Sequence, residues 1–212
     1  MAGYCGSVEK AVYHAESPLK ESYDTCSLTL SELVRQHRIK VVLTGEGSDE
    51  LFAGYVGYRL EGQRPDEDIL DAETMIEREI REKLWDDPDF LYERNFYEFE
   101  SIRRAIYSDA VNEQFETFDS VNQDFIDKRK IRNRHPIHKR SYLDFKLRLS
   151  DHLLADHGDR VAYANSVEAR YPFLDINLIE FAKTIPPSLL VNGSTEKYII
   201  KKRFTIYFPA DF

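Results

Sequence analysis

The stretch VVLTGEGSDELFAGY, residues 41–55, places Glu46, Asp49 and Glu50 in one turn after a short apolar run. Glycine-rich turns that open a helix bind phosphates, because bare backbone N–H groups and the helix N-terminus attract anions. Carboxylates would repel a phosphate unless a divalent cation, which takes oxygen ligands from both, lay between them. The pattern therefore predicts magnesium nucleotide chemistry. The alternative is a solvated turn whose acidic residues favour the positive end of the following helix.

The elements around this turn should form a β–turn–α unit. Ile39 and residues 41–43 form an apolar, β-branched run of strand length, typical of a buried parallel strand. Gly45 and Gly47 supply the turn, and Ser48 is a plausible N-cap for the helix that DELFAGY opens. Open α/β sheets bind ligands at such a corner.

Most of the remaining chain reads as helix. One helix is predicted over residues 24–37, with Leu30, Leu33 and Val34 facing inward. The charged segment 64–90 carries one apolar stripe, typical of a surface amphipathic helix, and two or three helices should follow it.

Two further helices are predicted near the C-terminal end of the sequence. Asp175 should cap one that runs through Lys183, and Ser194 or Thr195 should cap the last.

Histidines gather around another helix, predicted over residues 138–156. Four of the six lie in or beside it: His135, His138, His152 and His157. No cysteine lies nearby, no HExxH pattern occurs, and Pro136 separates the first histidine from the helix. The pattern favours structural histidines over a metal site.

Composition narrows the class of protein. With 212 residues, 42% hydrophobic, the chain makes one large domain or one and a half small ones with a real core. A net charge of -9 argues against nucleic acid as the main partner. No apolar run approaches the ~18 residues that span a bilayer, and the first residues lack a signal-peptide pattern. Cys5 and Cys26 form neither a CxxC motif nor a disulfide framework, so we expect a cytoplasmic protein with reduced thiols.

Two segments resemble the glutamine-dependent asparagine synthetases. Residues 41–55 are similar to the family's [ST]-GEG-[AS]-DE-x-F-x-GY loop, and DHGDRVAYANSVEARYPFLD, residues 156–175, is similar to its D-R-x-x-x-A-x-S-x-E-x-R-x-PFLD segment. EKYIIKKRF, residues 196–204, resembles the family's last conserved helix. The resemblance covers most of residues 1–212, with 64–132 the least diagnostic part. It implies the C-terminal synthetase domain, a member of the PP-loop ATP pyrophosphatase group.

The fold that this resemblance implies is α/β. It is a partial adenine-nucleotide alpha-hydrolase-like domain, predominantly helical, with few parallel strands.

The chemistry of these synthetases would explain the acidic turn. They activate a carboxylate with ATP, giving an acyl-adenylate and pyrophosphate, and ammonia then displaces AMP to leave an amide. The resemblance implies ATP and Mg²⁺ as cofactors, with Glu46 as the catalytic acid/base or orienting residue and Asp49 as the magnesium ligand. The implied nucleotide-binding residues are Thr44, Gly45, Glu46, Gly47 and Asp49.

The second segment would support the site through either an ion-pair network or ligand contact. The candidate supporting residues are Asp159, Arg160, Glu168 and Arg170.

The sequence also departs from the family pattern. It contains no SGGxDS-type phosphate loop, Ala2 stands where the glutaminase domain has its nucleophilic cysteine, and the sequence ends about where a loop with an essential lysine should begin. Lys197, Lys201 and Lys202 belong to the preceding helix and are assigned no catalytic role. We therefore expect a domain incomplete at both ends, inert or nearly so alone. Its uncovered sheet edge should require a complementary N-terminal chain or self-association.

The substrate stays open at this point. The leading hypothesis is asparagine formation from aspartate, with ammonia derived from glutamine. Relatives that share the motifs make other amides, as β-lactam synthetases and peptide cyclases do, and Tyr163 replaces a residue that is smaller or a thioether in the family. A non-catalytic, partner-binding scaffold is the alternative from another class.

Overall fold

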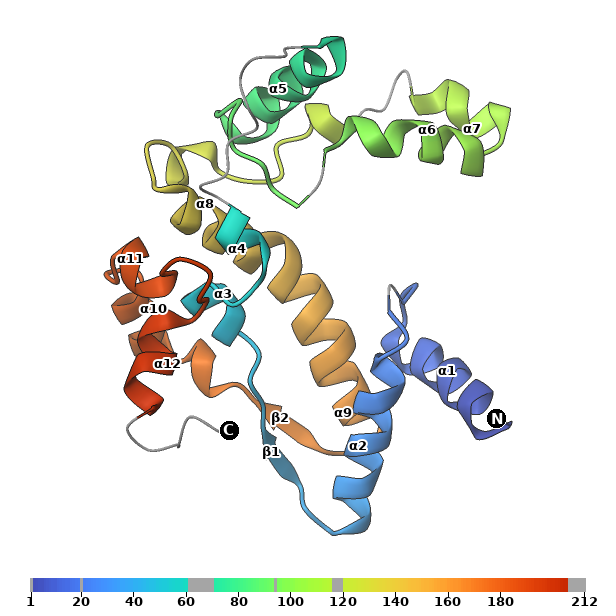
Figure 1. Cartoon of the computed structure of the whole chain (residues 1–212). Coiled ribbons are helices and arrows are strands. Elements are labelled where there is room, and N and C mark those ends of the chain that lie inside the picture. Colours follow the sequence, from blue (N-terminus) through green and yellow to red (C-terminus); the bar gives the residue numbers. More distant parts are fainter. Residues whose placement is uncertain (1, 20, 61–70, 94, 116–119, 206–212) are drawn as a thin grey trace.

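The computed structural model describes residues 2–19, 21–60, 71–93, 95–115 and 120–205. These residues are predominantly helical and contain a small parallel sheet of two strands (Figure 1). Strand β1 (Val41–Leu43) pairs with β2 (Glu168–Arg170), with Val42 opposite Ala169. The predicted α/β class, mostly helical with few parallel strands, is confirmed.

One long helix organises the molecule. It comprises α8 (Pro136–Leu143), a π-helical segment η3 (Asp144–Arg160) and α9 (Val161–Tyr163) in direct succession. The ring of His135 accepts a hydrogen bond from the Ile137 N–H. Pro136 occupies the first turn of the helix, where the backbone N–H that proline lacks would have no partner within the helix. The helix is thus longer at both ends than predicted, and Pro136 opens it.

The N-terminal helices α1 (Ala2–Ala15) and α2 (Asp24–Gln36) pack beside the far end of this long helix (Figure 1). A small core joins Ala11, Leu28 and Val161. The predicted extent of α2 is confirmed, but its predicted inner face is wrong for Leu30 and Leu33, which are 63% and 50% exposed, while Val34 is half-buried. Leu28 and Ser31 point inward instead: Leu28 packs against Ala11 and Val161, and the Ser31 hydroxyl donates to the Val161 carbonyl.

Among the described residues, helices cover one face of the two-stranded sheet and leave the other open. Side chains alternate across a strand, so Ala169 is buried while Glu168 and Arg170 lie on the opposite face. Their partners Val41 and Leu43 share that open face and are 36% and 73% exposed. The prediction of a buried strand is therefore wrong for these side chains.

A core cluster packs the acidic turn against the C-terminal helices. The elements are α3 (Ser48–Phe52), α4 (Gly57–Leu60), η4 (Pro172–Leu174), α10 (Ile176–Ala182), α11 (Pro187–Leu190) and α12 (Tyr198–Phe204). The buried residues are Leu51, Phe52, Ala53, Tyr58, Ile137, Ala182, Ile185 and Leu190. Each large side chain buried here contributes about 1.5–3 kcal/mol to folding.

Of the two helix caps predicted near the C-terminal end, one is confirmed and the other is wrong. Asp175 caps α10 as predicted, accepting from the Asn177 and Leu178 N–H groups. Helix α12 begins at Tyr198 without a side-chain cap, so the predicted caps Ser194 and Thr195 are wrong.

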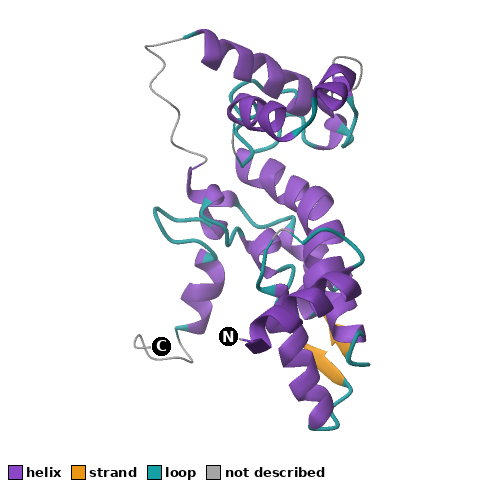
Figure 2. Cartoon of the chain, turned by 90° about the vertical axis from the view of Figure 1, so that its right-hand side faces the viewer, coloured by secondary structure: helices purple, strands orange, loops and turns teal. Residues whose placement is uncertain are grey.

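A second helical lobe lies at the opposite end of the long helix from the sheet (Figures 1 and 2). It contains α5 (Ala72–Trp85), α6 (Tyr97–Ile106), α7 (Asp109–Phe115), η1 (Ser120–Asn122) and η2 (Lys128–Lys130). Its core joins Trp85, Phe90, Ile131 and Leu143. The amphipathic helix predicted over 64–90 is α5, and residues 64–70 of that prediction lie outside the described residues.

Membrane-spanning helices were sought among the described residues. None of their helices is long and apolar enough to cross a bilayer.

Candidate active site

The acidic turn leaves the sheet at the carboxyl end of β1. The Thr44 N–H donates to the Arg170 carbonyl at 3.0 Å, which extends the pairing with β2 by one residue. Gly47 then takes a φ of +88°, in the left-handed region that favours glycine. A Cβ at Gly47 would overlap the Leu174 side chain, so the PFLD segment lies directly beneath the turn. The structure therefore brings together the two sequence segments singled out above.

Two buried oxygens at this turn lack a hydrogen-bond partner among the residues that the structure describes. They are Glu46 Oε2 and Thr44 Oγ1. Buried polar atoms are nearly always satisfied, so these two oxygens are available to accept a hydrogen bond from a bound group. Gly45, between them, is exposed, and a Cβ built on it meets no other atom within 4 Å. The three predicted residues thus form a corner with room for a polar ligand.

Asp49 contacts a lysine that sequence reasoning had set aside. Lys197 Nζ lies 2.9 Å from Asp49 Oδ1 and donates to Ser48 Oγ at 3.0 Å. Lys197 directly precedes α12 and has a φ of +50°, which turns it out of the helix. This contact could not be predicted from the sequence, because residues 196–204 resemble one continuous helix. Gly54 leaves space for the pair, since a Cβ there would overlap the Asp49 carboxylate and Lys197 Cε.

A cavity of about 400 Å³ opens beside the turn. Its wall comes from the turn, the N-terminal segment, the long helix and the PFLD segment, and includes Gly45, Glu46, Asp49, Tyr23, His157 and Phe173. Small-molecule sites are concave, with a few polar groups set among apolar and aromatic side chains. The predicted residues Glu46 and Asp49 thus line a hollow that can hold a ligand.

The four predicted supporting residues lie around the site and not at Glu46 or Asp49. Arg160 donates to the Ala15 carbonyl at 2.6 Å and to Asp156 at 2.8 Å, which ties α1 to the long helix. Asp159 accepts from the Tyr171 hydroxyl at 2.7 Å. Glu168 and Arg170 pair at 2.7 Å on the open face of β2. These contacts hold together the elements that surround the site.

Glu50, the third acid of the turn, belongs to the core. It is 1% exposed, and its Oε1 accepts from the Tyr55 hydroxyl at 2.6 Å. Burial raises the pKa of Glu50, and the hydrogen bond from Tyr55 opposes that rise. The carboxylate form is therefore the costly one in the folded state.

Glutamine at position 50 should change how stability depends on pH. A raised pKa means that the folded chain binds the proton more tightly than the unfolded chain, so the contribution of Glu50 is present below its ordinary pKa of 4.5 and is lost as the pH rises. Glu50→Gln does not ionise, so its stability relative to the parent should increase from about pH 4.5 to about pH 7.5. Urea denaturation at both pH values measures the difference.

Tyr55→Phe provides the matched control for this experiment. It removes the donor that stabilises the Glu50 carboxylate, so it should cost more at the higher pH, opposite in sign to Glu50→Gln. Parallel pH profiles for all three proteins would contradict the assignment of Glu50 as a buried, ionising group.

Comparison with known proteins places this geometry in context. A family model described as asparagine synthase matches residues 3–212. Amidase chyE of Penicillium rubens is 31% identical over 94% of this chain and 34% of its own length, and amidase chry2 of Gibberella zeae is 28% identical over 92% and 34%. Asparagine synthetase [glutamine-hydrolyzing] 1 of Bacillus subtilis is 28% identical over 94% and 33%. The chain thus spans about a third of the length of these relatives. No solved structure shows a significant match.

Proposed function

Because this chain belongs to the asparagine synthase family, we propose that it carries the carboxylate-activating corner of an ATP-dependent, AMP-forming carbon–nitrogen ligase. The observation that carries the proposal is the pair of acids, Glu46 and Asp49, at the carboxyl end of a parallel strand beside a cavity of about 400 Å³. The corner lies within the matched region, so motif and geometry support the same site.

The residues present fit a magnesium nucleotide. The unsatisfied Thr44 Oγ1 and the open space at Gly45 suit a polar group that lies close to the backbone. Asp49 is a partly exposed carboxylate, the ligand type that Mg²⁺ prefers. Its charge is offset by Lys197, so a magnesium ion would compete with that ammonium group. When bound, magnesium ATP would supply the adenylyl group that activates the substrate carboxylate, with pyrophosphate released at that step and AMP released when the amine attacks.

Glu46 would act on the attacking amine. Its Oε2 is buried, lacks a hydrogen-bond partner in the described part of the chain, and belongs to a side chain that lines the cavity. A carboxylate in this position orients an incoming ammonia molecule and takes a proton as the carbon–nitrogen bond forms. Water exclusion by Tyr23 and Phe173 on the cavity wall would protect the activated carboxyl group from hydrolysis.

We propose aspartate as the carboxylate and ammonia derived from glutamine as the amine, so that the product is asparagine. The relative of Bacillus subtilis named asparagine synthetase supports this choice. A second candidate is another amide-forming reaction, since two relatives of equal or higher identity are named amidases. Tyr163, the substitution noted in the sequence, is 57% exposed and so tells us little about the substrate.

We further propose that the site is completed by a second segment or a second chain. The open face of the sheet supports this, because Val41 and Leu43 lie uncovered beside exposed Ile39. Exposed apolar sheet faces and edges recruit partners.

Exchange of labelled pyrophosphate into ATP tests the function. The chain would be assayed alone and in a purified complex with the part of the Bacillus subtilis relative that this chain does not cover, with magnesium and a panel of carboxylates. We expect at most trace exchange alone and aspartate-dependent exchange in the complex. Exchange driven by another carboxylate would favour the second candidate. A stable complex that binds no magnesium ATP and exchanges with no carboxylate would instead indicate a non-catalytic scaffold.

A further inference from the structure

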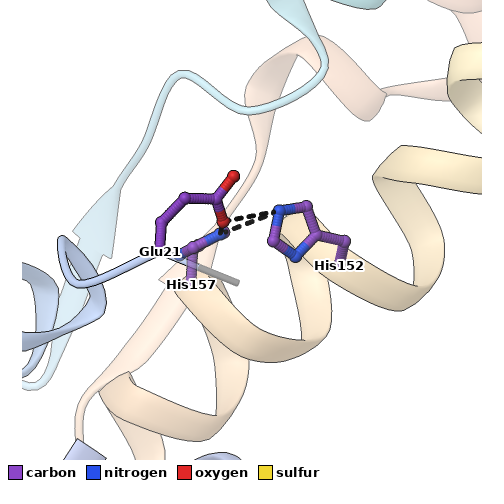
Figure 3. Close-up of side chains that lie close together, drawn as sticks. All are labelled: Glu21, His152 and His157. Carbon is purple, nitrogen blue, oxygen red and sulfur yellow. Dashed lines mark hydrogen bonds and ion pairs between the residues drawn. The ribbon is translucent and has the colours of Figure 1, made fainter. Parts of the chain in front are cut away.

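Two histidines of the long helix meet a glutamate from the segment before α2 (Figure 3). Glu21 Oε2 lies 3.1 Å from His152 Nε2 and 3.6 Å from His157 Nε2, and the two imidazole nitrogens lie 3.3 Å apart. All three side chains point at one spot between the helix and the segment (Figure 3). The sequence pattern had favoured structural histidines here.

The π-helical segment is what brings the histidines together. His152 and His157 are five residues apart, and in an α-helix such residues point about 140° away from each other. In a π-helix the backbone hydrogen bonds join residues five apart, so these residues follow one another on the same face. Both histidines lie inside the π-helical residues Asp144–Arg160. Such turns occur frequently at functional sites.

We propose that Glu21, His152 and His157 bind a zinc ion, or a divalent ion of similar preference, at a site separate from the magnesium site. Zinc binds imidazole nitrogen and carboxylate oxygen at about 2.0–2.2 Å in tetrahedral geometry, so two of its ligand atoms lie about 3.3 Å apart. The three observed separations, 3.1, 3.3 and 3.6 Å, bracket that value. Two nitrogens and one oxygen suit zinc better than magnesium, which prefers oxygen ligands.

The surrounding groups also match a histidine-bound metal. His157 Nδ1 contacts the buried carboxylate of Asp24, and His152 Nδ1 lies 3.6 Å from Asp156 Oδ2. Metal-binding histidines almost always turn the other ring nitrogen to a carboxylate or carbonyl, which fixes the ring and raises its basicity. Tyr23 adds a hydroxyl 2.9 Å from His157 Nε2, beside the three proposed ligand atoms.

The carboxylates around the two histidines also favour a bound cation. Glu21, Asp24 and Asp156 bring three carboxylates to the two imidazoles, and Arg160 pairs with Asp156 at 2.8 Å. The side chain of Asp24 is 1% exposed and that of His157 is 4% exposed. A buried carboxylate is costly unless it is paired, and a divalent cation would offset the charge of Asp24, which is buried, together with that of Glu21, whose side chain is 40% exposed.

The proposed ion would join two parts of the chain. Glu21 belongs to the segment that links α1 and α2, while both histidines belong to the long helix. Tyr23 and His157 also line the cavity beside Glu46. The metal would thus have a structural role: it would hold one wall of the cavity in place without contacting the reacting atoms.

Cobalt titration tests the proposal. The full chain, stripped with a chelator, should take up one Co²⁺ with the visible absorption of a four-coordinate ion. Zinc should displace it, and excess Mg²⁺ should not. Zinc should also raise the melting temperature of the parent chain, because an ion that binds only the folded state stabilises it.

Variants separate a metal site from a mere ion-pair cluster. Glu21→Ala should weaken Co²⁺ binding at least about tenfold and His152→Ala about a hundredfold or more, while Asp24→Asn should weaken it about 10–100-fold. Glu21 has a side chain 40% exposed, so its variant tests the ligand with little risk to folding, and circular dichroism checks the others. His37→Ala, at an exposed histidine at the end of α2, should bind as the parent does. No stoichiometric uptake, or equal affinity in Glu21→Ala and the parent, would overturn the proposal.

Discussion

Asparagine in place of Asp49 is expected to lower aspartate-dependent pyrophosphate exchange by about a hundredfold or more in the assembled complex. The substitution keeps the shape of the side chain and removes the charge that we propose binds magnesium. Asp49 is 37% exposed and its only described charged partner is Lys197, so the fold should tolerate the change. The loss should come with a higher magnesium requirement, and added magnesium should recover part of the activity.

Two further variants make this result specific. Glu46→Gln should also reduce amide formation about a hundredfold or more, but should leave the magnesium requirement close to that of the parent, because its proposed role is proton transfer. Asp89→Asn is the control, since Asp89 pairs with Arg78 in the other helical lobe, and should exchange at the parent rate. If Asp49→Asn retains full exchange at limiting magnesium, the assignment of the metal ligand is wrong.

The secondary structure around the acidic turn could be predicted from the sequence. The apolar run, the glycines and the following helix were predicted from local patterns, and the structure confirms the β–turn–α unit. These features are local because backbone conformation and capping depend on near neighbours. The first helical residue was misplaced by one position, since Gly47 is the N-cap and Ser48 begins α3.

Burial was predicted less well than the elements themselves. An apolar run predicts a buried strand only if both faces of the sheet are covered, and Val41 and Leu43 face the uncovered side. Strand β2 was not predicted at all, because its sequence Glu-Ala-Arg lacks the β-branched, apolar character of a strand. Which face of a helix or strand is buried depends on the elements that pack against it, and the periodicity of apolar residues does not identify those elements.

The contacts near the site that sequence reasoning did not predict share one cause. Lys197 reaches Asp49 through a left-handed backbone conformation, and His152 meets His157 through a π-helical turn. Ordinary helical periodicity describes neither case, so both contacts are invisible to a pattern search. Departures from regular backbone geometry cluster at functional sites. Both departures here lie beside the same cavity, which lends weight to the corner as the functional centre of the chain.

The polar core beneath that corner should dominate its stability. Asp144 is 0% exposed and accepts hydrogen bonds from the Tyr58 hydroxyl at 2.6 Å and the Tyr92 hydroxyl at 2.9 Å. The guanidinium of Arg140 lies over both tyrosine rings, 5.4 and 5.2 Å from their centroids. Burial raises the pKa of Asp144, while the hydrogen bond from Tyr58 opposes that rise. One carboxyl group thus joins the long helix to α4 and to the loop after α5.

Alanine at position 144 is expected to lower the free energy of unfolding by about 3–5 kcal/mol, because it leaves two hydroxyl donors without their acceptor and removes the negative charge beside the buried Arg140. Asp144→Asn should cost less, since its amide oxygen still accepts from one tyrosine. Tyr92→Phe should cost about 1 kcal/mol in the parent and nearly nothing in Asp144→Ala, because the bond that it removes is already lost. Urea denaturation of the four proteins completes the double-mutant cycle. Additive losses from the two substitutions would show that Asp144 does not act through Tyr92.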